Sequence, residues 1–155
     1  MKKIFIILLL TLIFIAGCDN KKAITKKEFK SKIEESNFTV INSINQFQGY
    51  DYIKTAYLAY DEYNNQIEFY SFDDYMSATS FYEVNKKMIQ SEEMDTSGIE
   101  RIKKTYKSYM LTTDSKYFYL SQIENTVIFT SIKVKYKDKI TDIIKKLPSG
   151  CWQRI

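Results

Sequence analysis

The stretch QIEFYSFDDYMSATSFYEVNKKMI, residues 66–89, decides the fold because a strand and a helix meet in it. Residues 66–72 carry aromatic and β-branched side chains, which favour a β-strand. Asp73 and Asp74 follow where a helix needs an N-terminal cap. Apolar side chains and one asparagine then recur at helical spacing: Ala78, Phe81, Tyr82, Asn85, Met88 and Ile89. We therefore expect a strand followed by a one-sided helix of about four turns.

The residues before this stretch predict a β-hairpin and an earlier helix. Residues 53–60 are a second strand candidate, and the polar connection at residues 61–65 favours an antiparallel hairpin with the strand that follows. Further upstream, Thr25 and Glu28 have the spacing of a capping box at the start of a helix. Residues 38–43 then have the composition of another strand.

The residues after this stretch predict a loop, a meander and a last helix. Residues 91–102 are polar and contain Gly98, so we expect a mobile loop there. Three β-rich segments with short connectors predict the meander: residues 105–112, 116–122 and 126–133. Apolar side chains at helical spacing indicate the last helix: Tyr136, Ile140, Ile143, Ile144 and Leu147.

These elements predict the order αβββ-αβββ-α and an α+β fold with an antiparallel sheet, or sheets, and helices packed on one face. Residues 25–155 are a normal length for a single domain. The order suggests a possible tandem repeat of a helix and a meander, although similarity between the halves is weak. In topology it resembles the tandem arrangement of β-lactamase-inhibitor-like proteins. A two-layer sandwich with another strand order is the alternative.

If the helices cover one face of the sheet, the other face is free for recognition. Residues 116–122 alternate Phe118 and Leu120 with Tyr117 and Tyr119. Tyrosine combines a large contact area with a hydroxyl group, which suits a binding surface. The tyrosines of this possible binding face are Tyr57, Tyr70, Tyr106, Tyr117 and Tyr119. The simpler interpretation is that tyrosine suits half-buried strands.

Residues 1–17 have a basic start, an apolar run over residues 4–16 and small residues at its end, as in a secretory signal peptide. As a helix, the apolar run would be about 20 Å long, shorter than the roughly 30 Å core of a bilayer. Residues 15–18, IAGC, resemble a lipobox. We therefore expect cleavage between Gly17 and Cys18 and a covalent diacylglycerol on Cys18. Two acyl chains anchor a protein stably, which places it at the cell membrane, facing outside the cytoplasm.

This processing changes the charge and the cysteine chemistry. Removal of Lys2 and Lys3 with the signal lowers the formal net charge from +4 to +2, which argues against a nucleic-acid partner. Residues 18–24 become a lipidated cysteine and a short tether. The lysines that follow either attract anionic headgroups or form a solvated helix face. With the Cys18 thiol alkylated, Cys151 has no partner for an intrachain disulfide.

The sequence indicates no catalytic site. The chain has no histidine and no glycine-rich phosphate-binding motif, so no residues stand out as a nucleophile with its base, as a metal site or as a cofactor site. Paired carboxylates keep an enzymatic alternative open, because two carboxyl groups suffice for glycoside hydrolysis. The adjacent pairs are Asp61-Glu62, Asp73-Asp74 and Glu92-Glu93.

The lipobox, a lysine-rich first helix and a strand ending in Phe72-Asp73-Asp74 occur together with an alanine-containing helix. In this combination the chain resembles small bacterial lipoproteins of Gram-positive type and uncharacterised function. The resemblance implies a fold and a location at the cell membrane, and it implies no catalytic residues.

We therefore expect a membrane-anchored binding module for an envelope protein, peptide or glycan. The alternative is a small carboxylate-dependent envelope enzyme or a substrate-delivery lipoprotein. A pocket that gathers carboxyl groups of raised pKa would favour the alternative, whereas an exposed aromatic patch would favour binding.

Overall fold

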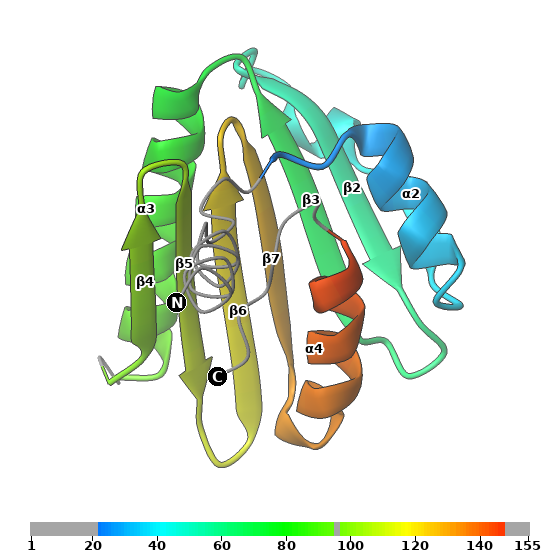
Figure 1. Cartoon of the computed structure of the whole chain (residues 1–155), viewed down its shortest axis with the longest axis vertical. Coiled ribbons are helices and arrows are strands. Elements are labelled where there is room, and N and C mark those ends of the chain that lie inside the picture. The colour runs from blue at the N-terminus through cyan, green and yellow to red at the C-terminus, as the bar shows by residue number, and fades with distance from the viewer. Residues whose placement is uncertain (1–21, 95–96, 148–155) are drawn as a thin grey trace, which may run out of the picture.

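A computed structural model describes residues 22–94 and 97–147 of the 155-residue chain. The described strands form one seven-stranded antiparallel sheet in the order β1-β2-β3-β7-β6-β5-β4 (Figure 1), which confirms the expected α+β class. The strands are β1 (Thr39–Asn42), β2 (Ile53–Tyr60), β3 (Gln66–Phe72), β4 (Ile99–Lys103), β5 (Tyr106–Thr112), β6 (Lys116–Ile123) and β7 (Thr126–Lys133). The helices are α2 (Lys26–Glu34), α3 (Tyr75–Glu92) and α4 (Lys137–Lys146), with the short 3-10 helices η1 (Ile44–Phe47) and η2 (Val134–Tyr136).

Two helices begin where the sequence provides a cap. The Thr25 hydroxyl accepts a hydrogen bond from the Glu28 amide, and the Glu28 carboxylate accepts one from the Thr25 amide, which confirms the capping box. Of the two candidate caps before α3, Asp74 is the one that binds, accepting from the Ser77 amide at 2.8 Å. These local hydrogen bonds explain why the helix starts could be read from sequence.

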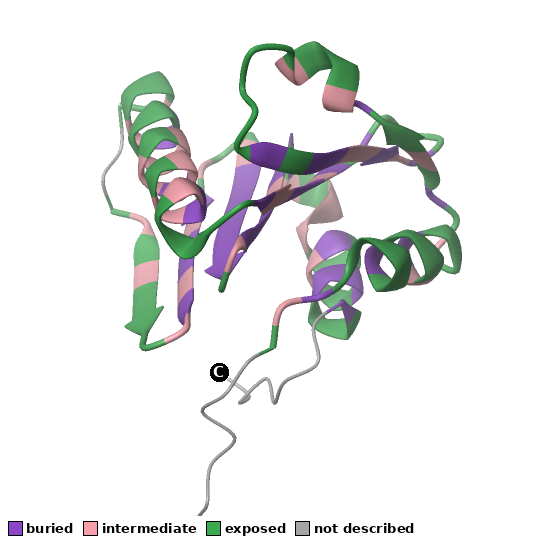
Figure 2. Ribbon diagram, turned by 90° about the horizontal axis from the view of Figure 1, so that it is seen from above, coloured by how far each residue is buried: buried purple, intermediate pink, exposed green. Residues whose placement is uncertain are grey.

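Helices cover both faces of the sheet, which corrects the expectation of helices on one face (Figure 2). On the first face, Ile67 and Phe69 of β3 share a core with Phe29 of α2 and with α4. On the second face, Tyr70 and Phe72 of the same strand pack with α3. Because β3 is apolar on both sides, the alternation of its residues does not identify a solvent-facing side.

The sheet consists of two meanders, β1-β2-β3 and β4-β5-β6-β7, whose last strands pair antiparallel with Phe69 opposite Ile128. If the two halves were repeats, a rotation would superimpose β3 on its antiparallel neighbour β7. The axis of such a rotation is perpendicular to the sheet, so the helices that precede the two meanders would lie on the same face. The leading helices α2 and α3 instead lie on opposite faces. The expected tandem repeat is therefore not confirmed.

Strand β4 lies in the segment that was expected to be a mobile loop, and α3 continues to Glu92 before it. β4 pairs with β5, with Glu100 opposite Tyr109, so the second meander has four strands instead of three. Glu100 also forms an ion pair with Lys86 of α3. The charged residues that made this segment look like a loop are typical of an edge strand, where they oppose pairing with other chains.

Candidate functional site

The five tyrosines expected to form a binding face do not share an exposed surface. Tyr57, Tyr106, Tyr117 and Tyr119 point to the α2 and α4 side of the sheet, whereas Tyr70 points to the α3 side. Tyr117 and Tyr119 are 2% and 3% exposed, Tyr70 and Tyr106 are also buried, and Tyr57 is half-buried. These side chains are parts of the two cores, so the simpler interpretation of tyrosine in half-buried strands describes them better.

The exposed aromatic and apolar surface lies elsewhere, in a groove between α3 and the segment that runs from η1 into β2. The groove has a volume of about 790 Å³. Figure 2 shows α3 and η1 on the same side of the sheet, separated across its surface. The residues that line the groove come from η1 and the turn after it, from Ile53 and Tyr70, and from one side of α3: Gln46, Phe47, Tyr50, Tyr52, Ile53, Tyr70, Asp74, Met76, Ser77, Ser80, Phe81, Val84, Asn85 and Met88.

Aromatic rings form the floor of the groove. The Tyr70 ring lies 4.6 Å from Phe81 of α3 and 5.5 Å, edge-on, from Phe47 of η1, measured between ring centroids. Phe72 packs against the same Phe81 ring at 5.2 Å. These rings connect α3 to the sheet and hold η1 against it, so the floor is part of the core and is fixed in shape.

The rim of the groove is apolar and exposed. On α3, Met76, Val84 and Met88 are 69%, 57% and 59% exposed. On the opposite side, Tyr50 and Tyr52 pack edge-on with each other and are 52% and 41% exposed. Single exposed apolar side chains are ordinary, but several of them around one hollow are typical of a binding surface.

A carboxylate lies next to this floor. Glu68 is half-buried on the same side of β3 as Tyr70 and accepts a hydrogen bond from the Tyr70 hydroxyl at 2.5 Å. Burial raises the pKa of Glu68, and the Tyr70 hydrogen bond opposes that shift only in part. Burial and the adjacent Glu68 carboxylate raise the pKa of Tyr70. The pair therefore places one polar, acidic position beside an otherwise aromatic floor.

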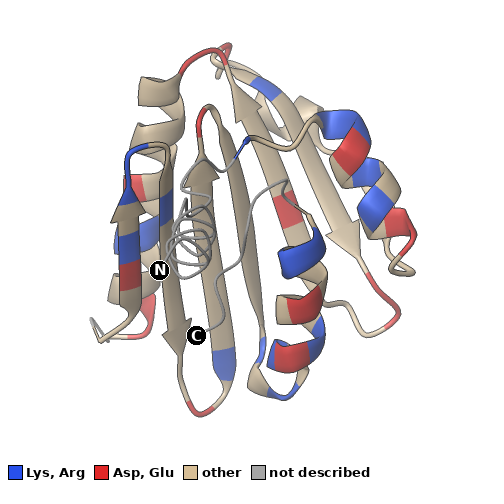
Figure 3. Ribbon diagram, viewed as in Figure 1, with Lys and Arg blue, Asp and Glu red and all other residues tan. Residues whose placement is uncertain are grey.

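Two charged residues of α3 bind strands β4 and β5, beside which the helix lies (Figure 3). Lys86 pairs with Glu100 of β4, and Glu83 pairs with Lys107 of β5 at 3.1 Å. Lys116 of β6 binds the carboxylates that end the helix. On the groove side, Asp74 is the only charged residue that lines the hollow. No lysine or arginine is among the described lining residues, although the exposed Lys87 follows the lining residue Ser80 by seven positions, two helical turns.

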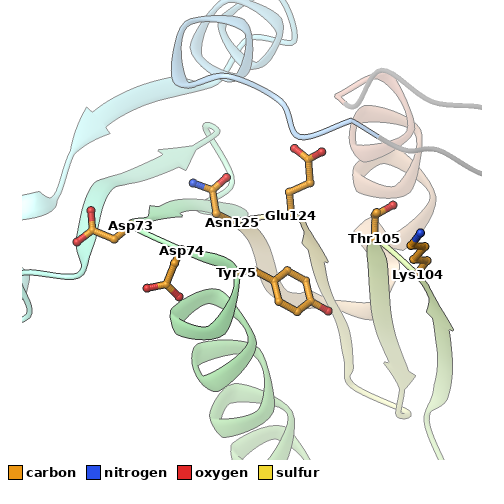
Figure 4. Close-up of a pocket in the computed structure, with 7 residues that line it drawn as sticks. All are labelled: Asp73, Asp74, Tyr75, Lys104, Thr105, Glu124 and Asn125. Atoms are coloured by element: carbon orange, nitrogen blue, oxygen red, sulfur yellow. The ribbon is translucent and has the colours of Figure 1, made fainter.

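A second hollow, of about 460 Å³, lies at the N-terminal end of α3 and includes two of the predicted acids (Figure 4). Asp73 forms an ion pair with Lys54 at 3.0 Å, and Asp74 is occupied as the helix cap, which lowers its pKa through the hydrogen bond from the Ser77 amide. Figure 4 shows Glu124 pointing away from both carboxylates. The acids around this hollow therefore do not converge on one point.

The remaining adjacent acids also have structural partners. Asp61 accepts hydrogen bonds from Lys139 at 2.8 Å and from the Asn65 amide groups. Glu92 and Glu93 both bind Lys116, at 2.7 and 2.8 Å. Within residues 22–94 and 97–147, no cluster of three or more carboxylate, cysteine or histidine side chains is placed to hold a metal ion.

The predicted lipidation site Cys18, the cleavage position at Gly17 and Cys151 lie outside the described residues. In the part of the chain that the structure describes, no helix has the length and apolar character needed to cross a bilayer. Ile24, assigned to the tether from sequence, is 4% exposed and packs in the core with α2. The folded domain therefore begins slightly earlier than expected.

No protein family, curated protein or solved structure matches this chain.

The sequence interpretation missed the groove. Helix α3 carries more apolar residues than one core-facing stripe can use: Ala78, Tyr82 and Ile89 are buried, whereas Val84 and Met88 are exposed. A helix with this surplus is a signal for a second contact surface. The segment from η1 to Tyr52 lies between two strand candidates and has no regular pattern, so nothing in the sequence related its aromatic residues to α3.

Proposed function

We propose that the protein is a lipid-anchored binding module of the cell envelope and that the groove beside α3 holds an apolar segment of an envelope protein or peptide. The observation that carries this proposal is the exposed rim formed by Met76, Val84, Met88, Tyr50 and Tyr52 around an aromatic floor. Methionine is flexible and polarizable, so it adapts to different apolar partners. Exposed tyrosine adds contact area at a low entropic cost.

A glycan is a weaker candidate for this groove. Sugars need hydrogen-bonding groups along the surface that holds them. Some lining residues carry such groups, among them Gln46, Ser77 and Ser80. The exposed apolar lining residues of α3, Met76, Val84 and Met88, provide none. Asn85 already donates its side-chain amide to the Phe81 carbonyl. The chemistry of the rim therefore favours protein over carbohydrate.

The proposed location of the protein rests on its N-terminal sequence. We propose that the signal is removed at Gly17 and that Cys18 carries a diacylglycerol, which holds the domain at the outer side of the cell membrane. The folded part begins at Ile24, so at most a few residues separate it from the lipid and the domain stays within roughly 20 Å of the membrane. No nucleic acid and no further cofactor enter this proposal.

Site-specific photo-crosslinking in intact cells tests the function. A photoreactive residue at position 88 lies on the rim, and one at position 102, which is 65% exposed on β4, is a matched control. We expect one partner to crosslink at position 88 and not at position 102, and Cys18→Ala to abolish that product. Equal products at both positions, or none at position 88, would contradict the proposal.

The same Cys18→Ala variant tests the anchor. We expect it to leave the membrane fraction while it keeps the circular dichroism spectrum and melting transition of the domain. Loss of the melting transition would contradict the domain boundary, and retention in a carbonate-washed membrane fraction would contradict the lipid anchor.

A carboxylate-dependent enzyme is the second candidate, and the raised pKa of Glu68 is the observation that favours it. Hydrolysis of glycosides by this route needs a second carboxyl group across the scissile bond. Turnover of an envelope glycan that is lost in Glu68→Gln would support this candidate. Unchanged turnover in that variant would remove Glu68 from the chemistry.

A further inference from the structure

The groove beside α3 also indicates the conformation and charge of its occupant. We propose that it binds a basic amphipathic α-helix of a partner protein, with the apolar side of that helix against α3 and the aromatic floor. This inference rests on the proposed function and names the class of partner for the same site.

The backbone around the groove favours a helix over an extended segment. One wall is α3, whose backbone groups are paired within the helix, and the floor strand β3 is paired on both sides, with β2 and β7. The open edges of the described sheet belong to β1 and β4, and neither strand lines the groove. An extended peptide would find no strand edge to bind there, whereas a helix satisfies its own backbone hydrogen bonds.

The spacing of the α3 side chains fits a packed helix. Ser77, Phe81, Val84 and Met88 follow each other at intervals of four, three and four residues along the groove side. This ridge extends over about 16 Å of helix axis, the length of three turns. A row with this alternating spacing is the seam along which two helices pack side by side, with about one contact per turn. The floor rings of Tyr70 and Phe47 supply the surface beneath the second helix.

The charges favour a basic partner. The lining residues include Asp74 at one end of the ridge and no lysine or arginine. Glu68 adds a half-buried carboxylate next to Tyr70. Lys86 of α3 forms its ion pair with Glu100 of β4, and the exposed Lys87 is not among the residues that line the groove. Lysine or arginine on the occupant would therefore be attracted by Asp74 and Glu68, whereas acidic residues would be repelled by them.

The test uses three fluorescent 18-residue peptides and the anchored full chain in phosphatidylcholine nanodiscs. The first peptide is a leucine and lysine amphipathic helix, the second has glutamate in place of lysine, and the third is the first with two central prolines that prevent helix formation. Fluorescence anisotropy gives the affinities, and empty nanodiscs give the lipid background. We expect a Kd of about 10 μM or tighter for the first peptide and at least tenfold weaker binding for the other two.

Variants locate the binding. Val84→Glu and Met88→Glu place a charge on the exposed rim, and Ile102→Glu places one on a similarly exposed residue outside it. We expect the two rim variants to weaken binding of the first peptide at least tenfold and the control to change it less than twofold. All three should keep the melting temperature of the parent chain, because each replaced side chain is more than half exposed.

The outcomes separate this inference from the proposed function. If the proline peptide binds as well as the helical one and remains sensitive to Val84→Glu, the groove is a binding site but its occupant is not a helix. Comparable binding of the acidic peptide would overturn the charge argument in the same way. If Val84→Glu has no more effect than Ile102→Glu, both proposals fail. The chain could instead self-associate, in a way that Val84→Glu abolishes and that the helical peptide does not inhibit. This result would assign the groove to a second copy of the chain.

Discussion

The two sides of strand β3 differ in what covers them. On one side, Ile67 and Phe69 are completely buried beneath Phe29 and Ile33 of α2, which are also 0% exposed. On the other side, α3 covers part of the sheet and leaves a groove with a rim of exposed methionine, valine and tyrosine. One strand thus supplies a closed core and the floor of a candidate binding site. The difference separates residues that stabilise the fold from residues that are free to bind.

Two carboxylates show the same contrast. Asp61 lies by α4, and its side chain is 2% exposed. Burial would raise the pKa of Asp61, but the hydrogen bonds from Lys139 and Asn65 outweigh it, and the pKa is lowered. Glu68, on the groove side, has a raised pKa because its one described partner, Tyr70, does not compensate for burial. A fully partnered acid stabilises the fold, whereas an under-partnered acid is typical of a site.

The largest expected effect comes from the closed side. Phe29→Ala should lower the free energy of unfolding by about 3–5 kcal/mol, because it removes a fully buried ring that stacks 4.8 Å from Phe69. Urea denaturation followed by circular dichroism measures it. A loss below about 1 kcal/mol would show that this face is not the tightly packed one.

Asp61→Asn should destabilise the domain by about 2 kcal/mol at pH 7, since it weakens the bonds to Lys139 and Asn65 around a buried group. The folded pKa of Asp61 is lowered, so its contribution is present above about pH 4 and is lost as the pH falls through the folded pKa. The free energies of unfolding of the parent and the variant, measured by urea denaturation from pH 7 to pH 3, should therefore approach each other as the pH falls. Asp142→Asn, on an exposed ion pair, is the control and should change stability by less than about 0.5 kcal/mol.

Glu68→Gln should act in the opposite direction, with a gain of up to about 1 kcal/mol at pH 7. The folded pKa of Glu68 is raised, so the parent chain loses stability as the pH rises from about 4 through the folded pKa. The variant lacks this dependence. Chemical denaturation at several pH values measures the difference, and Glu62→Gln at an exposed position is the control. A variant that is less stable at pH 7 would mean that the Glu68–Tyr70 pair stabilises the fold.

The smallest effect on stability is expected at the groove rim. Val84→Ala and Met76→Ala should change the free energy of unfolding by less than about 0.5 kcal/mol, because both side chains are mostly exposed. Denaturation curves that superimpose on the parent curve would confirm that the rim is available for binding. A loss above about 1.5 kcal/mol in either variant would show that the rim is part of the core.

The sequence predicted the features that depend on neighbouring residues. The capping box at Thr25 and Glu28, the cap before α3 and the hairpin between β2 and β3 are all local arrangements, and the structure contains them. The helix over residues 137–146 follows the expected apolar spacing. These elements are determined by residues that are close together in the sequence, so a single sequence suffices to predict them.

The sequence did not predict the features that depend on how distant elements meet. Residues 67–72 are apolar on both sides, so they allow helices on one face or on two. The groove exists because Phe47 and Phe81, far apart in the chain, both pack against Tyr70 while α3 stays clear of η1. No local pattern specifies the separation between α3 and η1. The one sign of the groove in the sequence is that α3 has more apolar residues than its core-facing side needs.

The most direct test of the central claim is a methyl NMR titration of the anchored full chain, labelled with ¹³C at the methionine methyl groups. Met76 and Met88 report on the groove, whereas Met94 lies outside it and Met110 packs against the opposite core. Adding the basic amphipathic helix should shift or broaden the Met76 and Met88 signals and leave Met94 and Met110 unchanged. Shifts at Met94 or Met110 without any at Met76 and Met88 would contradict the assignment of binding to the groove beside α3.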